Sequence, residues 1–202
     1  MISGIISAVL FFAYLVIWKI KKHELQAKSG TDSDVYRRAD KPVQRFFARM
    51  ERLLRASVIL SIFLHIQQFF KPVFLIPLQS MNNIEFDILG FVIGSAGLAL
   101  CRIAQITIGN SWRVGIDEYA KPGLITHGIY SIIRNPTYTG LFMLCMGVIV
   151  INPTILFSWW VLAFVLTIEF QVRCEEEYLE SIYGSEYSHY RKNTYRYIPY
   201  LY

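Results

Sequence analysis

Five apolar segments dominate the chain and constrain its fold more than any other feature. They cover residues 2–18, 56–78, 84–108, 138–150 and 155–172. A helix of about 20 apolar residues spans the roughly 30 Å hydrocarbon core of a bilayer and satisfies its own backbone hydrogen bonds there. Only 17% of the residues are charged, against about 25% in an average soluble domain. The sequence therefore predicts an all-α, polytopic membrane protein of about five transmembrane helices, and it excludes a disordered chain.

Several of these segments carry further signals at their ends. Positive residues follow the segment 2–18 instead of preceding it, which favours a retained anchor over a cleaved signal peptide. Pro72, in the outer half of the second segment, predicts a kink or an early end of the helix. Asn152 and Pro153 mark a tight turn between the last two segments. These two segments are therefore predicted to form a helical hairpin, each half of which is short for a full span.

The basic residues are distributed unevenly along the chain. Of the 20 Lys and Arg residues, eleven lie between residues 19 and 55, whereas the loop 79–83 and the turn 151–154 contain none. Cytoplasmic loops of membrane proteins are enriched in Lys and Arg. Five spans with every basic segment on the cytoplasmic side place the N-terminus outside and the C-terminus in the cytoplasm.

Arg45, Arg49 and Arg52 recur at the spacing of one helix face. Such a face could bind nucleic acid, but beside apolar spans it is more typical of a helix that lies on anionic lipid headgroups. Membrane topology thus accounts for the net charge of +5. We expect the lipid bilayer as a partner and no nucleic acid.

Residues able to do chemistry gather in two polar segments. The three cysteines are far apart and join no cluster with histidine, so neither a disulfide framework nor a metal site is expected. The first polar segment contains Gly109, Trp112, Leu124, Gly128, Tyr130, Arg134, Pro136, Tyr138 and Gly140. The second, near the C-terminus, contains Glu175, Glu176, Leu179, Tyr183, Gly184, Tyr187, Tyr190, Arg196 and Pro199.

This arrangement resembles the isoprenylcysteine carboxyl methyltransferase and phospholipid methyltransferase superfamily of integral-membrane enzymes. Its pattern reads G-x-x-W, then L-x-x-x-G-x-Y-x-x-x-R-H-P-x-Y-x-G, and near the C-terminus E-E-x-x-L-x-x-x-F/Y-G-x-x-Y-x-x-Y followed by R-x-x-P. The match covers about the last 95 residues, and the first hundred match in hydropathy only. The resemblance implies transfer of a methyl group from S-adenosylmethionine to a lipophilic or lipid-linked acceptor. That acceptor is an isoprenylcysteine-like carboxyl group or another lipophilic molecule.

The resemblance also implies a cofactor pocket closed by both motifs. Its expected cofactor-binding residues are Leu124, Ile125, Tyr130, Asn135, Pro136, Tyr138 and Glu175. Asn135 stands where the family usually has His. The Asn side chain keeps a hydrogen-bond donor and an acceptor but has no titratable ring. Gln171 stands where the isoprenylcysteine enzymes have an Arg that meets the substrate carboxylate. Arg173 lies two positions later, about 200° around a helix, so this departure disfavours a prenylcysteine carboxylate as the acceptor.

Methyl transfer from a sulfonium is an in-line displacement that depends on positioning and on exclusion of water. A carboxylate acceptor needs a cation to orient it, and Arg196 or Arg173 is the expected catalytic residue. An amine acceptor has to arrive neutral, and Glu176 could then take its proton. Trp112 and Arg134 are the expected substrate-binding residues. Their structural alternatives are an interfacial anchor for Trp112 and a clamp on the tail carboxylates for Arg134.

One membrane domain is expected, with a three-span anchor at 1–108 and a methyltransferase core at 109–202. Two other functions stay open. An NADPH-dependent enzyme like the sterol reductases would share a related C-terminal helical architecture and an R-H-P-like motif. A non-catalytic membrane scaffold with a degenerate site would account for Asn135 and Gln171.

Overall fold

A computed structural model of the protein describes residues 2–29, 35, 41–67, 73–113, 115 and 123–200 of the 202. All regular structure in these residues is helical, apart from one isolated bridge between Ile133 and Tyr195. The α-helices are α1 (Ile2–Ser29), α2 (Pro42–Ile66), α3 (Ile84–Ile108), α4 (Pro136–Ile151), α5 (Ile155–Tyr183) and α6 (Ser185–Lys192). The short 3₁₀ helices are η2 (Val73–Leu75), η3 (Gln79–Met81), η4 (Gly109–Ser111) and η5 (Gly128–Ser131). The predicted all-α class is confirmed.

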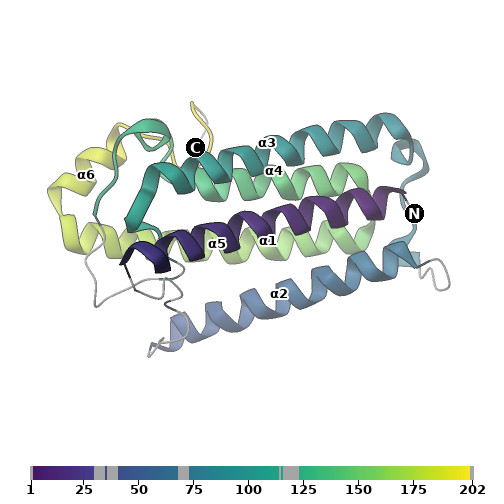
Figure 1. The fold of residues 1–202 in the computed structure, drawn as a ribbon, viewed down its shortest axis with the longest axis horizontal. Coiled ribbons are helices and arrows are strands. Elements are labelled where there is room, and N and C mark those ends of the chain that lie inside the picture. Colours follow the sequence, from purple (N-terminus) through teal and green to yellow (C-terminus); the bar gives the residue numbers. More distant parts are fainter. Residues whose placement is uncertain are drawn as a thin grey trace.

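The five long helices lie side by side, and successive helices run in opposite directions (Figure 1). One end of the bundle holds η2, η3 and the turn between α4 and α5. The other end, called the polar end below, holds the end of α1, the start of α2, residues 109–113 and 123–135, and α6. The basic segments of the sequence thus gather at one end of the molecule. Which side of the membrane this end faces stays a prediction.

Three helices are long and apolar enough to cross a membrane, judged by length and composition within the described residues. They cover Ile2–Lys28, Ile84–Ser111 and Ile155–Tyr183, and α4 is a shorter apolar helix. The chain is an integral membrane protein, while the predicted count of five spans stays a prediction. The statement that both hairpin halves are short was wrong for α5. This helix continues through the polar sequence after residue 172, because no helix breaker occurs before Gly184.

Helix α2 differs most from the sequence prediction. The basic stretch and the first part of the second apolar segment form one helix that begins at Pro42 and ends at Ile66. Proline is favoured at the first position of a helix because its missing N–H needs no partner there, and Lys41 before it is extended. The side chains on the predicted basic face are exposed, namely Arg45, Arg49 and Arg52. Pro72 lies outside the described residues, but α2 ends at Ile66, in agreement with the predicted early end of this helix.

Helices α3 and α4 pack backbone against backbone through glycines. A Cβ added at Gly97 would lie 2.4 Å from the carbonyl oxygen of Gly140, and one added at Gly147 would lie 2.5 Å from that of Gly90. Small residues allow such close approach of helices, which is how helices associate where the hydrophobic effect is weak. This contact fixes α4 along α3 and places the start of α4 beside Cys101, whose thiol donates to the carbonyl oxygen of Thr137 at 3.4 Å.

The predicted hairpin between α4 and α5 is confirmed. Thr154 caps α5 by accepting a hydrogen bond from the backbone N–H of Phe157 at 3.3 Å. At the other end, Gly184 has a φ of +52°, a left-handed conformation that favours glycine and ends the helix before α6. The second half of the apolar hairpin and the acidic motif at Glu175 therefore belong to one continuous helix.

Candidate functional site

A cavity of about 280 Å³ opens at the polar end of the bundle, between α1, α3, α5 and the segment before α4. Its walls are aromatic and apolar over most of their length, with a few polar groups. Ligand sites in proteins have this character, because apolar walls bury the ligand while a few polar groups orient it. The lining residues come from both the N-terminal half of the chain and the two motifs.

Most of the residues predicted from the sequence line this cavity. They are Leu124, Ile125, Tyr130, Asn135, Tyr138 and Glu175 of the expected cofactor set, and Trp112 and Arg134 of the expected substrate set. Pro136 is buried at the start of α4 and does not line the cavity. The three residues expected to be catalytic, Arg173, Glu176 and Arg196, do not line it either.

Glu175 faces the cavity with neutral partners. Its carboxylate accepts hydrogen bonds from the Tyr138 hydroxyl at 2.9 Å and from the Gln171 side-chain amide at 2.9 Å. The Gln171 amide also donates to the Tyr138 oxygen at 3.0 Å. Within the described part of the chain, no cation forms an ion pair with Glu175. Among the described residues, this carboxylate is therefore held at the cavity wall by neutral groups alone.

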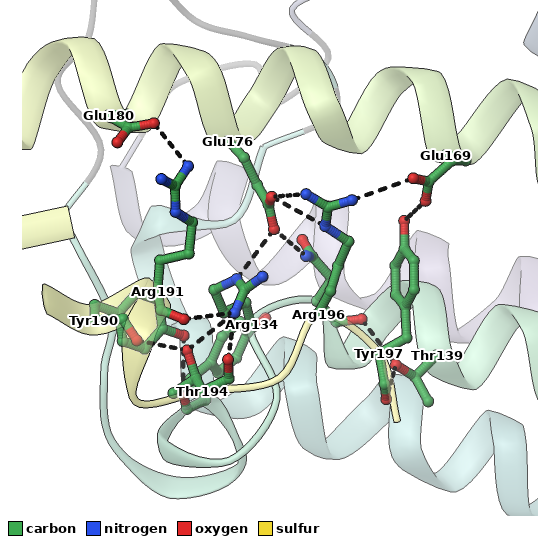
Figure 2. A network of polar contacts seen from close by, with 12 residues as sticks. Arg134, Thr139, Glu169, Glu176, Glu180, Tyr190, Arg191, Thr194, Arg196 and Tyr197 are labelled. Carbon is green, nitrogen blue, oxygen red and sulfur yellow. Dashed lines mark hydrogen bonds and ion pairs between the residues drawn. The ribbon is translucent and has the colours of Figure 1, made fainter. Parts of the chain in front are cut away.

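Glu176, the next residue of α5, does not line the cavity and is clamped by two guanidinium groups (Figure 2). It accepts from Arg134 Nε at 3.1 Å and from Arg196 Nη2 at 2.7 Å. The Asn135 side-chain amide donates to the same carboxylate at 3.0 Å. The side chains of Glu176, Arg134 and Arg196 are only 6%, 9% and 16% exposed. We call Glu176, Arg134, Asn135 and Arg196 the carboxylate clamp.

A second carboxylate extends this network along α5. Glu169 accepts from Arg196 Nη1 at 3.2 Å and from the Tyr197 hydroxyl at 2.6 Å, as Figure 2 shows. It also pairs with Arg173 at 2.7 Å, one turn along the helix. The side chain of Arg173 is 54% exposed. Arg173 therefore lies on the outer face of this network, away from the cavity.

Backbone hydrogen bonds join the segment before α4 to the segment after α6. The N–H of Arg134 donates to the carbonyl oxygen of Tyr195 at 2.8 Å, and the N–H of Tyr195 donates to that of Ile132 at 2.9 Å. The Tyr190 hydroxyl donates to the carbonyl oxygen of Tyr130 at 2.8 Å. The C-terminal tail is thereby tied to the residues that line the cavity, and the carboxylate clamp secures both to α5.

The Tyr130 phenol lines the cavity beneath this tail. Burial raises its pKa to about 12, since the charged phenolate loses its hydration. Burial likewise raises the pKa of Tyr187 and of Tyr190 above the ordinary value. These phenols keep their protons at neutral pH, and that of Tyr190 donates the hydrogen bond to the Tyr130 carbonyl oxygen.

Several cavity residues were not predicted from the sequence. Gln105 on α3 is 1% exposed, and its side-chain oxygen has no hydrogen-bond partner within the described residues. Tyr14, Trp18 and Glu51 come from the N-terminal half, which carries no motif. The available signal for Gln105 was a polar side chain inside an apolar span, which is costly there and commonly functional.

Comparisons with known proteins agree on one family. The family model described as phospholipid methyltransferase matches residues 88–186. A probable protein-S-isoprenylcysteine O-methyltransferase from Oryza sativa subsp. japonica is 28% identical over 120 residues, covering 55% of this chain and 60% of the relative. The protein-S-isoprenylcysteine O-methyltransferase of Tribolium castaneum is 27% identical over 117 residues, covering 56% of this chain and 41% of the relative. The chain thus matches about 40–60% of the length of these relatives.

A solved structure shares the fold. The eukaryotic intramembrane Ras methyltransferase, an isoprenylcysteine carboxyl methyltransferase, superposes with a TM-score of 0.58 at 18% sequence identity. The superposition covers 97% of this chain and 68% of that one. The likeness extends to α1 and α2, which lie outside the match to the family model.

Proposed function

Because this chain belongs to the isoprenylcysteine carboxyl methyltransferase and phospholipid methyltransferase superfamily, we propose that it is a membrane methyltransferase. In this proposal it transfers a methyl group from S-adenosylmethionine to a lipophilic or lipid-linked acceptor. The observation that carries the proposal is the Glu175 carboxylate, fixed at the cavity wall by Tyr138 and Gln171 with no cation paired to it in the described residues. A carboxylate in that setting is suited to a positively charged ligand.

The residues around the cavity fit this cofactor. When bound, S-adenosylmethionine supplies an activated methyl group on a sulfonium, together with an ammonium, a carboxylate and a nucleoside. Glu175 would hold a cationic part of it, and the unpaired oxygen of Gln105 would accept a hydrogen bond from a ligand donor. Leu124, Ile125 and Tyr138 would supply apolar and aromatic wall. Asn135 would line the same pocket while its amide holds Glu176, a role that needs no titratable ring.

The acceptor side of the cavity would combine an aromatic wall with one guanidinium. Trp112 is 6% exposed and meets Trp18 edge to face, with ring centroids 6.5 Å apart. Arg134 uses Nε for Glu176 and Nη1 for the carbonyl oxygens of Arg191 and Thr194. Its Nη2 makes no hydrogen bond within the described residues and would be available to an anionic group of the acceptor.

We assign positioning roles to Glu176 and Arg196. They are paired with each other at 2.7 Å and lie outside the cavity lining, so they would act through the residues that they hold. Arg173, paired with Glu169 on the outer face, would stabilise the same network. In this proposal the polar end faces the cytoplasm, since the basic segments lie there, and α1–α3 supply membrane anchoring together with part of the acceptor wall.

Thermal unfolding of the purified protein in detergent separates the proposed methyltransferase from a reductase-like enzyme. S-adenosylhomocysteine at about 100-fold excess over its Kd should raise the Tm by about 5 °C or more, because a ligand that binds only the folded state stabilises it. NADPH at the same concentration should leave the Tm unchanged. Stabilisation by NADPH alone would favour the reductase, and no shift with either ligand would contradict an intact cofactor pocket.

A further inference from the structure

A second cavity, of about 350 Å³, lies at the polar end between the end of α1 and the end of α3. It shares no lining residue with the first cavity. Its charged and polar residues are Lys21, Glu24 and Lys28 on α1, Arg102 on α3 and Asn110 on η4. Three cations thus face one carboxylate, and the cavity is electropositive.

The single carboxylate is already neutralised. Glu24 accepts from Arg102 Nη2 at 2.7 Å and from Arg102 Nη1 at 3.4 Å, so these two charges cancel. The charges of Lys21 and Lys28 remain. A site that offers two ammonium groups beside a satisfied ion pair attracts an anion.

Lys21 is the residue that requires an explanation. It is only 4% exposed, and it forms no hydrogen bond or ion pair with any residue that the structure describes. Lysine is almost never buried without a partner, because an ammonium group loses strong hydration on burial. The side chain lies in the wall of the cavity. Glu24 attracts Lys21 electrostatically but hydrogen-bonds to Arg102, so a ligand in the cavity would supply the direct contact that Lys21 lacks among the described residues.

The surroundings of the cavity point to a lipid. Lys21 lies three residues after the apolar run 2–18 of α1, where a membrane helix passes from the hydrocarbon core to the headgroup region. Ile106 lines the cavity and exposes 60% of its surface. Ile20 and Ile103, the sequence neighbours of Lys21 and Arg102, expose 44% and 51%. A headgroup in the cavity would therefore have apolar helix surface beside it for its acyl chains.

We propose that this cavity binds the phosphate of an anionic membrane phospholipid, with Lys21 as the principal contact and Lys28 as a second cation. Lysine binds phosphate as a compact charge, and basic pockets between membrane helices hold lipid headgroups in this way. The site is independent of the methyl transfer proposed above, since none of its residues lines the first cavity.

The test is a lipid titration of the detergent-solubilised, full-length protein by native mass spectrometry, without a methyl donor. Phosphatidylglycerol is the probe, and phosphatidylcholine and inorganic phosphate are the comparisons. Lys21→Met should weaken phosphatidylglycerol binding by about tenfold or more, the size of a hydrogen bond to a charged group. Lys19→Met is the matched control, because Lys19 is an exposed lysine on the same helix, and it should change the Kd by less than about twofold.

Lys28→Met provides a second variant in case Lys21→Met does not fold, since Lys28 is exposed; it should weaken phosphatidylglycerol binding by about threefold. Equal losses in Lys19→Met and Lys21→Met would overturn the proposal in favour of diffuse surface attraction. Binding of inorganic phosphate as tight as that of phosphatidylglycerol would overturn the lipid assignment and indicate a soluble anion. All of these results are obtained whether or not the protein transfers methyl groups.

Discussion

Replacing Glu176 by Ala should lower the free energy of unfolding by about 3–5 kcal/mol, the cost of removing one partner from a buried ion pair. The substitution leaves the guanidinium groups of Arg134 and Arg196 without the carboxylate between them, and these side chains are only 9% and 16% exposed. Arg196 keeps Glu169, and Arg134 keeps backbone carbonyl oxygens. Neither remaining contact supplies the missing charge to both cations.

The neighbouring residue offers a matched control for this prediction. Glu177 follows Glu176 on α5 and is exposed, so Glu177→Ala should change the free energy of unfolding by no more than about 0.5 kcal/mol. Denaturant unfolding in detergent, followed by tryptophan fluorescence, measures both variants. Equal stability of Glu176→Ala and Glu177→Ala would show that the carboxylate clamp does not hold the tail in place.

Replacing Glu175 by Gln should weaken S-adenosylmethionine binding by about 10-fold to 100-fold, as expected for loss of a hydrogen bond to a charged group. The free energy of unfolding should change by less than about 1 kcal/mol, because Tyr138 and Gln171 can still hydrogen-bond to the amide oxygen. Calorimetry in detergent gives the Kd, and Glu177→Gln is the control. Equal affinities of Glu175→Gln and Glu177→Gln would remove Glu175 from the cofactor site.

The same variant can identify which cationic group Glu175 holds. S-adenosylhomocysteine keeps the ammonium of the cofactor and lacks the sulfonium charge. A loss of affinity that is equal for both ligands assigns Glu175 to the ammonium. A larger loss for S-adenosylmethionine assigns it to the sulfonium. A carboxylate there would stabilise the positively charged ground state, so Glu175→Gln should change KM and kcat by different factors.

Much of the fold follows from local sequence signals. Asn83 caps α3 and Gly109 follows its last residue, so the predicted segment 84–108 coincides with the helix. Asn152 and Pro153 are a local signal of the same kind, since they mark the turn between α4 and α5. Helix α2 was mispredicted because hydropathy alone separated its basic and apolar parts, whereas Pro42 at the first helical position starts one continuous helix.

The sequence predicted most of the residues that line the site, but it predicted less well which of them contact one another. Motif spacing identified Glu175 and Glu176 together, but it could not tell that adjacent residues on a helix, about 100° apart, face the cavity and the carboxylate clamp respectively. Gln105 and Trp18 reach the cavity only because α1 and α3 pack beside it. Contacts of that kind arise from packing between distant segments. A polar residue within an apolar span was the local signal for Gln105, whereas no local pattern indicated Trp18.

Transfer of a labelled methyl group tests the central claim most directly. The purified protein is incubated with methyl-labelled S-adenosylmethionine and membrane lipid extract, and the labelled product is isolated and identified. We predict label in a lipid-extractable product with wild-type protein and with Glu177→Gln, and its loss with Glu175→Gln. Folded wild-type protein that neither binds S-adenosylmethionine nor labels any lipophilic acceptor would contradict the account.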